Sequence, residues 1–322
     1  MLIIGRPDAD RFINGLKNGL KKEHDFIDVT DKLLSPKEYF FPLLDTTFTF
    51  SIKDAVVSTP APPRSFVLWG LSLRDLEAIT YLDEIMSTPE KDYYYFRRRG
   101  RALLVGLTEE KFSLPPGGDI ILSVLEKDAL KVSAVTLRGE RAVKKYLPRI
   151  KSFKERRSHT RPVPAPRAGE EGTMTALRRL LMDAERLKDA VQWSWKGYPK
   201  LWERLMGECL GCGICTYVCP HCHCFSVEDG VDLSGDTARR RRRWDACTLP
   251  GFSKVAGGAD FHPTRRHRYY NWFFHKFVRA YLEFGKAQCV ACGRCADQCP
   301  ARIDIEEILL DITARYERRK RS

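Results

Sequence analysis

The sequence predicts two domains of different class, an α/β domain in the N-terminal half and a cysteine-rich α+β domain in the C-terminal half. Three observations lead to this prediction. Apolar segments alternate with a helical pattern over residues 1–150, a basic and proline-rich segment occupies 151–172, and all 11 cysteines lie after residue 208. Alternation of strands and helices is typical of α/β domains. We therefore expect a linker at 151–172 and a second domain over 173–322.

The N-terminal strands are predicted from apolar runs. Residues 65–70 (SFVLWG) have the continuous apolar character of a buried strand, and residues 101–107 (RALLVGL) and 119–125 (DIILSVL) repeat it. Between the first two runs, four apolar residues keep the spacing of one helix face: Leu73, Leu76, Ile79 and Leu82. The pattern predicts a core that carries no cysteine and no catalytic motif. We expect this domain to dock partner proteins.

The segment at 151–172 is basic at first, then proline-rich, and ends with glycine-containing sequence. This composition predicts an exposed, extended linker, with a docking arm as the alternative. A helical pattern follows at Leu177, Leu180, Leu181, Ala184, Leu187 and Val191. Another follows the last cysteine, at Ile305, Ile308, Leu309, Ile312 and Tyr316. The second domain is therefore expected to begin and end with helices.

The overall charge and the placement of the cysteines limit the class of protein. The formal net charge of +13 is compatible with nucleic acid, an anionic membrane or an acidic partner protein. No apolar run approaches the length of a membrane span, and the first residues lack the layout of a secretion signal. Cysteines grouped in tight runs favour metal binding in a reducing compartment over a disulfide framework. We expect a cytoplasmic protein without a membrane span.

One short motif occurs twice. The run Cys209-x2-Cys212-Gly-x-Cys215-x3-Cys219-Pro recurs as Cys289-x2-Cys292-Gly-x-Cys295-x3-Cys299-Pro. Three thiolates at this spacing can wrap one loop around three irons of a cubane, and glycine lets the backbone approach the inorganic sulfurs. In two-cluster ferredoxins the fourth cysteine, which precedes proline, ligates the other cluster. The motif therefore predicts two 4Fe–4S clusters in a ferredoxin-like domain.

The predicted ligand sets are crossed between the two runs. Cluster I takes Cys209, Cys212, Cys215 and Cys299. Cluster II takes Cys219, Cys289, Cys292 and Cys295. Structural zinc is the alternative, but zinc sites present two separated cysteine pairs and not two runs of three. Because a cubane stores one electron with little rearrangement, two adjacent clusters indicate electron transfer.

A large insert, residues 220–288, separates the two runs and carries further motifs. These are CPHCHCFSVED (219–229), RRWDAC (242–247) and FSKVAGGADF (252–261), with CVACGRCADQCPARIDI (289–305) after the insert. Together they resemble the dicluster iron–sulfur subunits of anaerobic redox complexes, namely those of the sulfhydrogenases (the beta subunit) and of anaerobic sulfite reductase. The resemblance implies a relay of electrons between a flavin subunit that uses NAD(P)H and a catalytic hydrogenase, sulfite reductase or other reductase subunit.

The N-terminal half departs from that family. Its members often have Pro-Cys-Asp where this chain has Leu73-Arg74-Asp75, and a further cysteine near Thr108 and Glu109. Any thiol role in that half therefore does not carry over. The chain also has no glycine-rich phosphate fingerprint, so we expect no flavin or nucleotide on it.

The insert holds the three remaining cysteines: Cys222, Cys224 and Cys247. They could form a third metal site, or they could pack as small buried residues beside cluster II. A complete site needs a fourth ligand, and four candidates lie in the insert: His221, His223, His262 and Asp245. A catalytic third site would make the chain a redox enzyme subunit. Otherwise the chain is a non-catalytic relay.

Five consecutive arginines, Arg239–Arg243, precede Trp244 in the insert. Such a run could bind phosphates and stack bases in a nucleic-acid interface. It could instead face anionic clusters, the pyrophosphate of a partner's flavin, or an acidic partner surface. Because the run lies between the cluster motifs, we favour the redox interpretation and expect no nucleic-acid partner.

Overall fold

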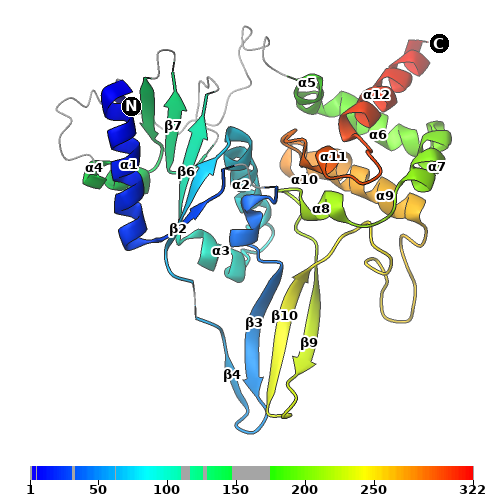
Figure 1. Ribbon diagram of the computed structural model, residues 1–322. Helices are drawn as coiled ribbons and strands as arrows, with labels where there is room; N and C mark the ends of the chain where they lie inside the picture. Colours follow the sequence, from blue (N-terminus) through cyan, green and yellow to red (C-terminus); the bar gives the residue numbers. More distant parts are fainter. Residues whose placement is uncertain are drawn as a thin grey trace. The chain divides into compact units, whose positions relative to one another are not determined.

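A computed structural model describes residues 2–4, 6–30, 33–61, 63–109, 117–125, 129–146 and 175–321 (Figure 1). They divide into two compact units. The first unit is drawn from residues 1–32, 36–41 and 61–166, and the second from 33–35, 42–60 and 167–322. The linker predicted at 151–172 lies outside the described residues.

The first unit contains a six-stranded mixed sheet in the order β1-β8-β7-β6-β5-β2. The strands are β1 (Leu2–Ile4), β2 (Asp25–Asp28), β5 (Phe66–Leu71), β6 (Ala102–Thr108), β7 (Ile120–Val124) and β8 (Leu130–Ala134). β2, β5, β6 and β7 are parallel, whereas β8 pairs antiparallel with β7 and β1. The three predicted strands are β5, β6 and β7. Because both their faces are buried, they have continuous apolar runs, and the predicted α/β class is confirmed.

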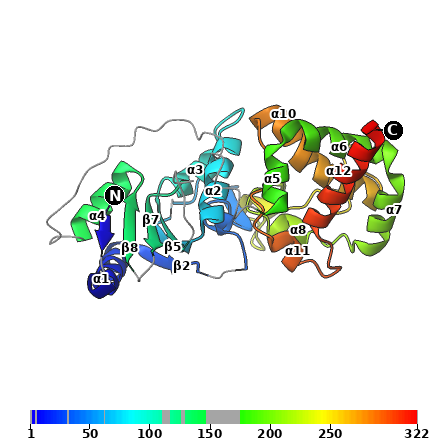
Figure 2. The ribbon, with the colours of Figure 1, turned by 90° about the horizontal axis from the view of Figure 1, so that it is seen from above.

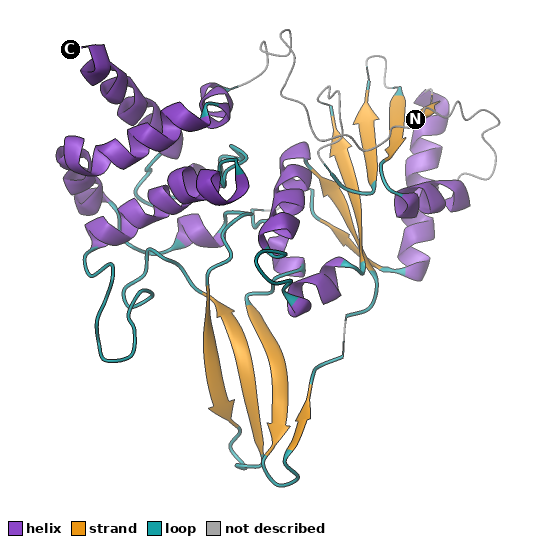
Figure 3. Ribbon diagram, turned by 180° about the vertical axis from the view of Figure 1, so that it is seen from behind, coloured by secondary structure: helices purple, strands orange, loops and turns teal. Residues whose placement is uncertain are grey.

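Helices cover the two faces of this sheet (Figure 3). They are α1 (Arg6–Glu23), α2 (Leu73–Ile85), α3 (Tyr93–Arg99) and α4 (Leu137–Tyr146), with the 3-10 turn η1 (Pro36–Tyr39). α1 and α4 share one core with alternate residues of the strands, such as Trp69 and Val105. On the opposite face, Leu76 of α2 packs closely against Gly106 of β6. A Cβ added to Gly106 would lie only 2.7 Å from Leu76 Cδ1. The predicted helix at Leu73–Leu82 is thus α2.

The second unit is mainly helical. Its helices are α5 (Ala176–Met182), α6 (Ala184–Gly197), α7 (Pro199–Glu208), α8 (Ile214–Tyr217), α9 (Arg265–Phe274), the π-helix η4 (His275–Arg279), α10 (Ala280–Phe284), α11 (Arg294–Asp297) and α12 (Ile305–Arg321). α6 and α12 lie side by side (Figure 2). The single helical pattern predicted over Leu177–Val191 is divided into α5 and α6 at Asp183. The Asp183 carboxylate accepts a hydrogen bond from the Arg186 backbone N–H and so begins a new helix.

The second unit also contains an antiparallel sheet in the order β4-β3-β10-β9 (Figure 1). Its strands are β3 (Leu44–Ser51), β4 (Val56–Ser58), β9 (Phe225–Val231) and β10 (Thr237–Trp244). The prediction assigned residues 42–60 to the first domain, 1–150, but the structure groups them with the second unit. The physical reason is pairing across almost two hundred residues, between β3 and β10, which a local sequence pattern does not reveal.

Candidate metal centre

The two cysteine runs fold in the same way. In the first run Gly211 and Gly213 have φ of +68° and +79°, and in the second run Ala291 and Gly293 have φ of +53° and +78°. These left-handed residues turn each run around its first cysteine. The Gly211 N–H lies 3.4 Å from Cys209 Sγ, and the Ala291 N–H lies 3.4 Å from Cys289 Sγ. Each loop therefore directs a backbone donor at a sulfur, as ligation of an anionic cluster requires.

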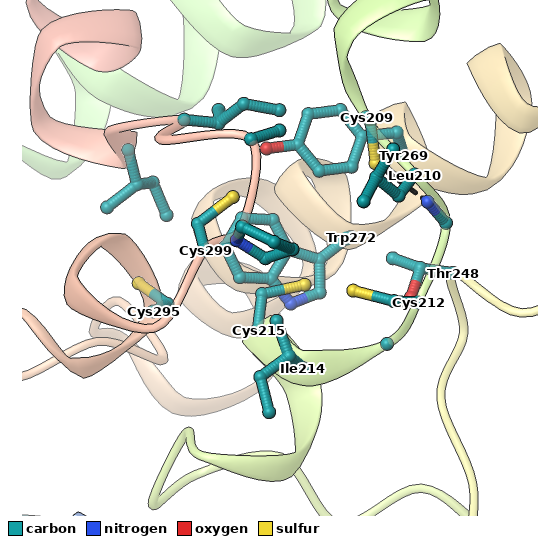
Figure 4. A pocket seen from close by; sticks show the side chains of 16 residues that line it. Cys209, Leu210, Cys212, Ile214, Cys215, Thr248, Tyr269, Trp272, Cys295 and Cys299 are labelled. Atoms are coloured by element: carbon teal, nitrogen blue, oxygen red, sulfur yellow. Dashed lines mark hydrogen bonds between the residues drawn. The ribbon is translucent and has the colours of Figure 1, made fainter.

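Five cysteines line one pocket in the second unit (Figure 4). Cys209, Cys212 and Cys215 come from the first run, and Cys299 comes from the second. Cys295 is also among the lining residues, and the rings of Tyr269 and Trp272 form part of the wall. The pocket thus contains the four cysteines predicted for cluster I together with Cys295, which was predicted for cluster II.

Burial controls the acidity of these thiols. It raises the pKa of Cys215 to about 12, with a further contribution from the charge of Cys209. Burial also raises the pKa of Cys209, and Cys212 and Cys299 add to the effect. Without bound metal, Cys209 and Cys215 remain protonated thiols at neutral pH. Iron that binds here must displace their protons, and the low polarity of the site then strengthens each iron–thiolate bond.

The second set of four is assembled in the same way. Burial raises the pKa of Cys289 to about 11, and it also raises the pKa values of Cys292 and Cys295. In each case the charge of Cys219, from the first run, contributes to the shift. Cys219, Cys289, Cys292 and Cys295, the four residues that the motif assigns to cluster II, therefore lie within electrostatic range of one another. Two sets of four thiols with backbone donors fit two 4Fe–4S clusters.

Comparison with known proteins agrees with this geometry. Residues 208–303 match the family described as 4Fe-4S dicluster domain. The chain is also 30% identical over 313 residues to sulfhydrogenase 2 subunit beta of Pyrococcus furiosus, an alignment that covers 89% of this chain and 85% of the relative. The chain belongs to this family of dicluster electron-transfer subunits. The predicted resemblance is confirmed. No solved structure matches the chain.

Three cysteines lie outside the two runs: Cys222, Cys224 and Cys247. Cys222 and Cys247 are buried, and Cys224 packs against the core cluster that contains Cys247. A hydrogen bond with the side chain of Cys224, followed by burial and the charge of Cys222, raises the pKa of Cys247 well above its usual value. The structure therefore brings all three thiols together. Cys222 and Cys224 precede the start of β9 and Cys247 follows the end of β10, and these two ends are adjacent because Trp244 pairs with Phe225.

The candidate fourth ligands have other contacts. The Asp245 carboxylate accepts from the Ala246 N–H at 2.7 Å, and His223 Nδ1 lies 3.1 Å from the His221 carbonyl oxygen. The His262 backbone N–H donates to Asp260 at 2.9 Å. None of these contacts joins a fourth ligand to the three thiols. Within the described residues, no group of three or more His, Cys, Asp or Glu side chains is placed as a single bound ion requires.

The arginine run forms strand β10, and three of its members pair with carboxylates of neighbouring strands. Arg240 makes a bidentate pair with Asp229 at 2.7 Å, and Arg243 pairs with Glu228 at 2.8 Å. Arg242 pairs with Asp45 of β3 at 3.1 Å, where both side chains are buried. The sequence interpretation, in which the run faces a cluster or a partner, missed these internal partners.

None of the described helices is both long and apolar enough to span a membrane.

Sequence patterns did not reveal one buried residue that contacts a cysteine of the motif. Lys276, in the π-helix η4, is 3% exposed, and its Nζ donates to Cys219 Sγ at 3.1 Å. Burial lowers the pKa of Lys276, but the charges of Cys219, Cys222 and Cys289 raise it more, so the pKa lies well above its ordinary value. The available signal was a lysine within an apolar helical segment, NWFFHKFV, which sequence analysis did not use.

Proposed function

We propose that this chain relays single electrons inside a cytoplasmic, anaerobic redox complex. The electrons pass between a flavin subunit that uses NAD(P)H and a catalytic hydrogenase, sulfite reductase or other reductase subunit. The observations that support the proposal are a pocket lined by cysteines of both runs and the electrostatic interaction of Cys219, from the first run, with three cysteines of the second run. The name of the Pyrococcus furiosus relative, a subunit of a sulfhydrogenase, supports a role within a larger assembly.

Each part of the site has a role in this relay. Cys209, Cys212, Cys215 and Cys299 would hold one 4Fe–4S cluster, and Cys219, Cys289, Cys292 and Cys295 the other. Such clusters supply one-electron storage with little rearrangement. The chain contributes backbone N–H donors from Gly211 and Ala291, which stabilise charge on sulfur, and a wall of aromatic rings that limits the access of water.

Metal analysis and EPR spectroscopy test the relay. Protein purified without oxygen is expected to contain about eight irons and about eight sulfides per chain, and to accept two electrons in separate one-electron steps. The reduced protein is expected to give the spectrum of two interacting cubanes. Stoichiometric zinc without iron, or iron that does not change oxidation state on reduction, would contradict the proposal.

Paired cysteine variants test the crossed ligand sets. With crossed ligation, the double variant Cys212→Ala, Cys299→Ala damages only cluster I and retains about four irons. The matched double variant Cys212→Ala, Cys219→Ala damages both clusters and retains almost none. If each run held its own cluster, the two iron contents would be exchanged. Iron content per folded chain therefore decides between the two arrangements.

A second candidate function follows from the gathering of Cys222, Cys224 and Cys247. In this alternative the chain is a redox enzyme subunit, and a third metal site at these residues is catalytic. It predicts about eleven or twelve irons, or one zinc beside about eight irons, and a spectral change on addition of substrate. Cys222→Ala would lower that metal content. Unchanged metal content and spectra in Cys222→Ala would leave these three residues a packing role.

A further inference from the structure

Lys276 occupies an unusual place in the second unit. It lies in the π-helix η4 (His275–Arg279), which joins α9 to α10 without an interruption in the chain of helical turns. π-helical turns are rare and occur often at functional sites, because the extra residue redirects side chains. Here the turn places a lysine inside the core, beside Phe277 and Val278, which are completely buried.

Two hydrogen bonds fix the ammonium group of Lys276. Its Nζ donates to Cys219 Sγ at 3.1 Å and to the Gln288 carbonyl oxygen at 2.8 Å. Gln288 returns a bond, because its N–H donates to the Lys276 carbonyl oxygen at 2.9 Å. Gln288 directly precedes Cys289, so Lys276 connects the first cysteine run to the second. Its Nζ also lies 5.5 Å from the ring centroid of Trp272.

A buried ammonium is costly unless an anion compensates it. Transfer of such a charge from water costs several kcal/mol, so a lysine retained here needs a negative partner. The nearest charged partners are cysteine sulfurs, and Cys219 is in direct contact. A cubane with four thiolates carries a net negative charge that grows by one on reduction. A fixed cation and a hydrogen bond to a ligating sulfur therefore stabilise the reduced state more than the oxidised state.

We propose that Lys276 raises the reduction potential of the cluster held by Cys219, Cys289, Cys292 and Cys295. It does so through its charge and its hydrogen bond to Cys219 Sγ. The inference rests on the proposed electron relay and specifies how one of its two clusters is tuned. Reduction of the cluster adds one electron, supplied by the redox partner or by a chemical reductant.

The test is a redox titration of the protein, followed by EPR, on Lys276→Met and Lys276→Gln. Methionine keeps an unbranched apolar side chain that is one atom shorter and removes both the charge and the donor, whereas glutamine keeps a donor. Arg279→Met is the matched control, because Arg279 is an exposed cation on the same π-helix and pairs with Glu283. Cys292→Ser identifies the reduction step that belongs to cluster II, since that step alone is lost or shifted.

We expect one of the two reduction steps to shift in Lys276→Met. The ratio of reduced to oxidised cluster II, at one fixed potential, is expected to fall at least tenfold, which corresponds to about 59 mV for a one-electron couple. Lys276→Gln should show a smaller fall, and Arg279→Met almost none. Iron content should stay at about eight in all three variants.

Three results would overturn the inference, and each differs from failure of the relay itself. Unchanged potentials at full iron content in both Lys276 variants would leave Lys276 a packing role. If Arg279→Met shifted the reduction potential of cluster II by the same amount, the effect would come from surface charge in general and not from Lys276. Loss of iron from both Lys276 variants would make Lys276 an assembly residue. Failure of the relay would appear instead as missing cubanes in the unaltered protein.

Discussion

Gly211 and Ala291 occupy equivalent positions in the two cysteine runs, and both have left-handed backbone. Each presents its N–H to the first sulfur of its run. A left-handed conformation costs a residue with a Cβ roughly 1–2 kcal/mol, whereas glycine adopts it freely. The second run therefore maintains the same loop with a strained residue, and ligation of the cluster must offset that strain.

This asymmetry predicts opposite effects of two substitutions. Gly211→Ala is expected to destabilise the metal-loaded protein by about 1 kcal/mol, because only backbone strain is added: a new Cβ would lie 3.6 Å from the Arg265 side chain, an ordinary contact. Ala291→Gly is expected to be neutral or slightly stabilising. The measurement is the midpoint of anaerobic guanidinium unfolding, followed by cluster absorbance.

Gly207→Ala is the control, since Gly207 lies in α7 with open space around its Cα and no left-handed backbone. It should not lower the midpoint. Equal effects of Gly211→Ala and Gly207→Ala on the midpoint would show that the left-handed backbone at Gly211 is not the cause of the lost stability.

At the residue scale, the sequence reveals the cysteine motif of the dicluster family but does not point to Lys276. Cysteine ligands are recognisable because a cubane imposes short, fixed spacing within one loop. Lys276 contacts Cys219 across 57 positions, and that contact depends on how α9 and η4 pack. No local pattern encodes it.

Among the elements, β10 depends on a strand that is remote in sequence. Arg242 of β10 and Asp45 of β3 form an ion pair in which the side chains are 6% and 1% exposed. The Thr47 hydroxyl donates to the Arg240 carbonyl oxygen at 3.0 Å and reinforces the same register. Because the pair is shielded from water, loss of one partner would leave the other charge buried without compensation.

We expect Asp45→Ala to lower the free energy of unfolding of the second unit by about 3–5 kcal/mol. Asp229→Ala removes an exposed partner of Arg240 and should cause little measurable loss. The double variant Asp45→Leu, Arg242→Met replaces both charges with apolar groups and should recover most of the stability. Denaturant unfolding monitored by circular dichroism would measure all three. Equal losses in Asp45→Ala and Asp229→Ala would contradict the role assigned to burial.

The elements also show which sequence patterns were sufficient to predict a strand or a helix boundary and which were not. β5, β6 and β7 were predicted because a parallel strand buried on both faces is apolar throughout. β3, with sequence LDTTFTFS, alternates polar and apolar residues and was not recognised, since its partner β10 follows almost two hundred residues later. The division between α5 and α6 was missed because the apolar periodicity continues across Asp183. The hydrogen bond with which Asp183 caps α6 leaves no trace in that periodicity.

At the scale of the whole molecule, the two units differ in their cysteine content and in which parts of the chain they include. Every cysteine lies in the second unit, and the core around them extends from Leu177 to Tyr316. Residues 42–60 contribute β3 and β4 to that unit, although they precede most of the first unit in sequence. The chain therefore crosses between the units more than once. A simple cut at the predicted linker would separate β10 from its partner strand.

This arrangement predicts how truncated chains behave. A chain of residues 173–322 alone and a chain with residues 42–60 joined to it through a flexible linker should both hold about eight irons, because both contain all the ligands and their core. Only the second should remain monomeric and unfold at high denaturant concentration. In the first, Arg242 lacks Asp45, and β10 exposes an unpaired edge that favours association.

Iron analysis, light scattering and denaturant unfolding on the two chains provide the test. Loss of iron from both chains would mean that the first unit is required for cluster assembly. Equal stability of the two would show that β3 contributes little. If the outcome is as expected, the first unit is dispensable for holding the clusters, and its function is then to be sought in the binding of partner proteins.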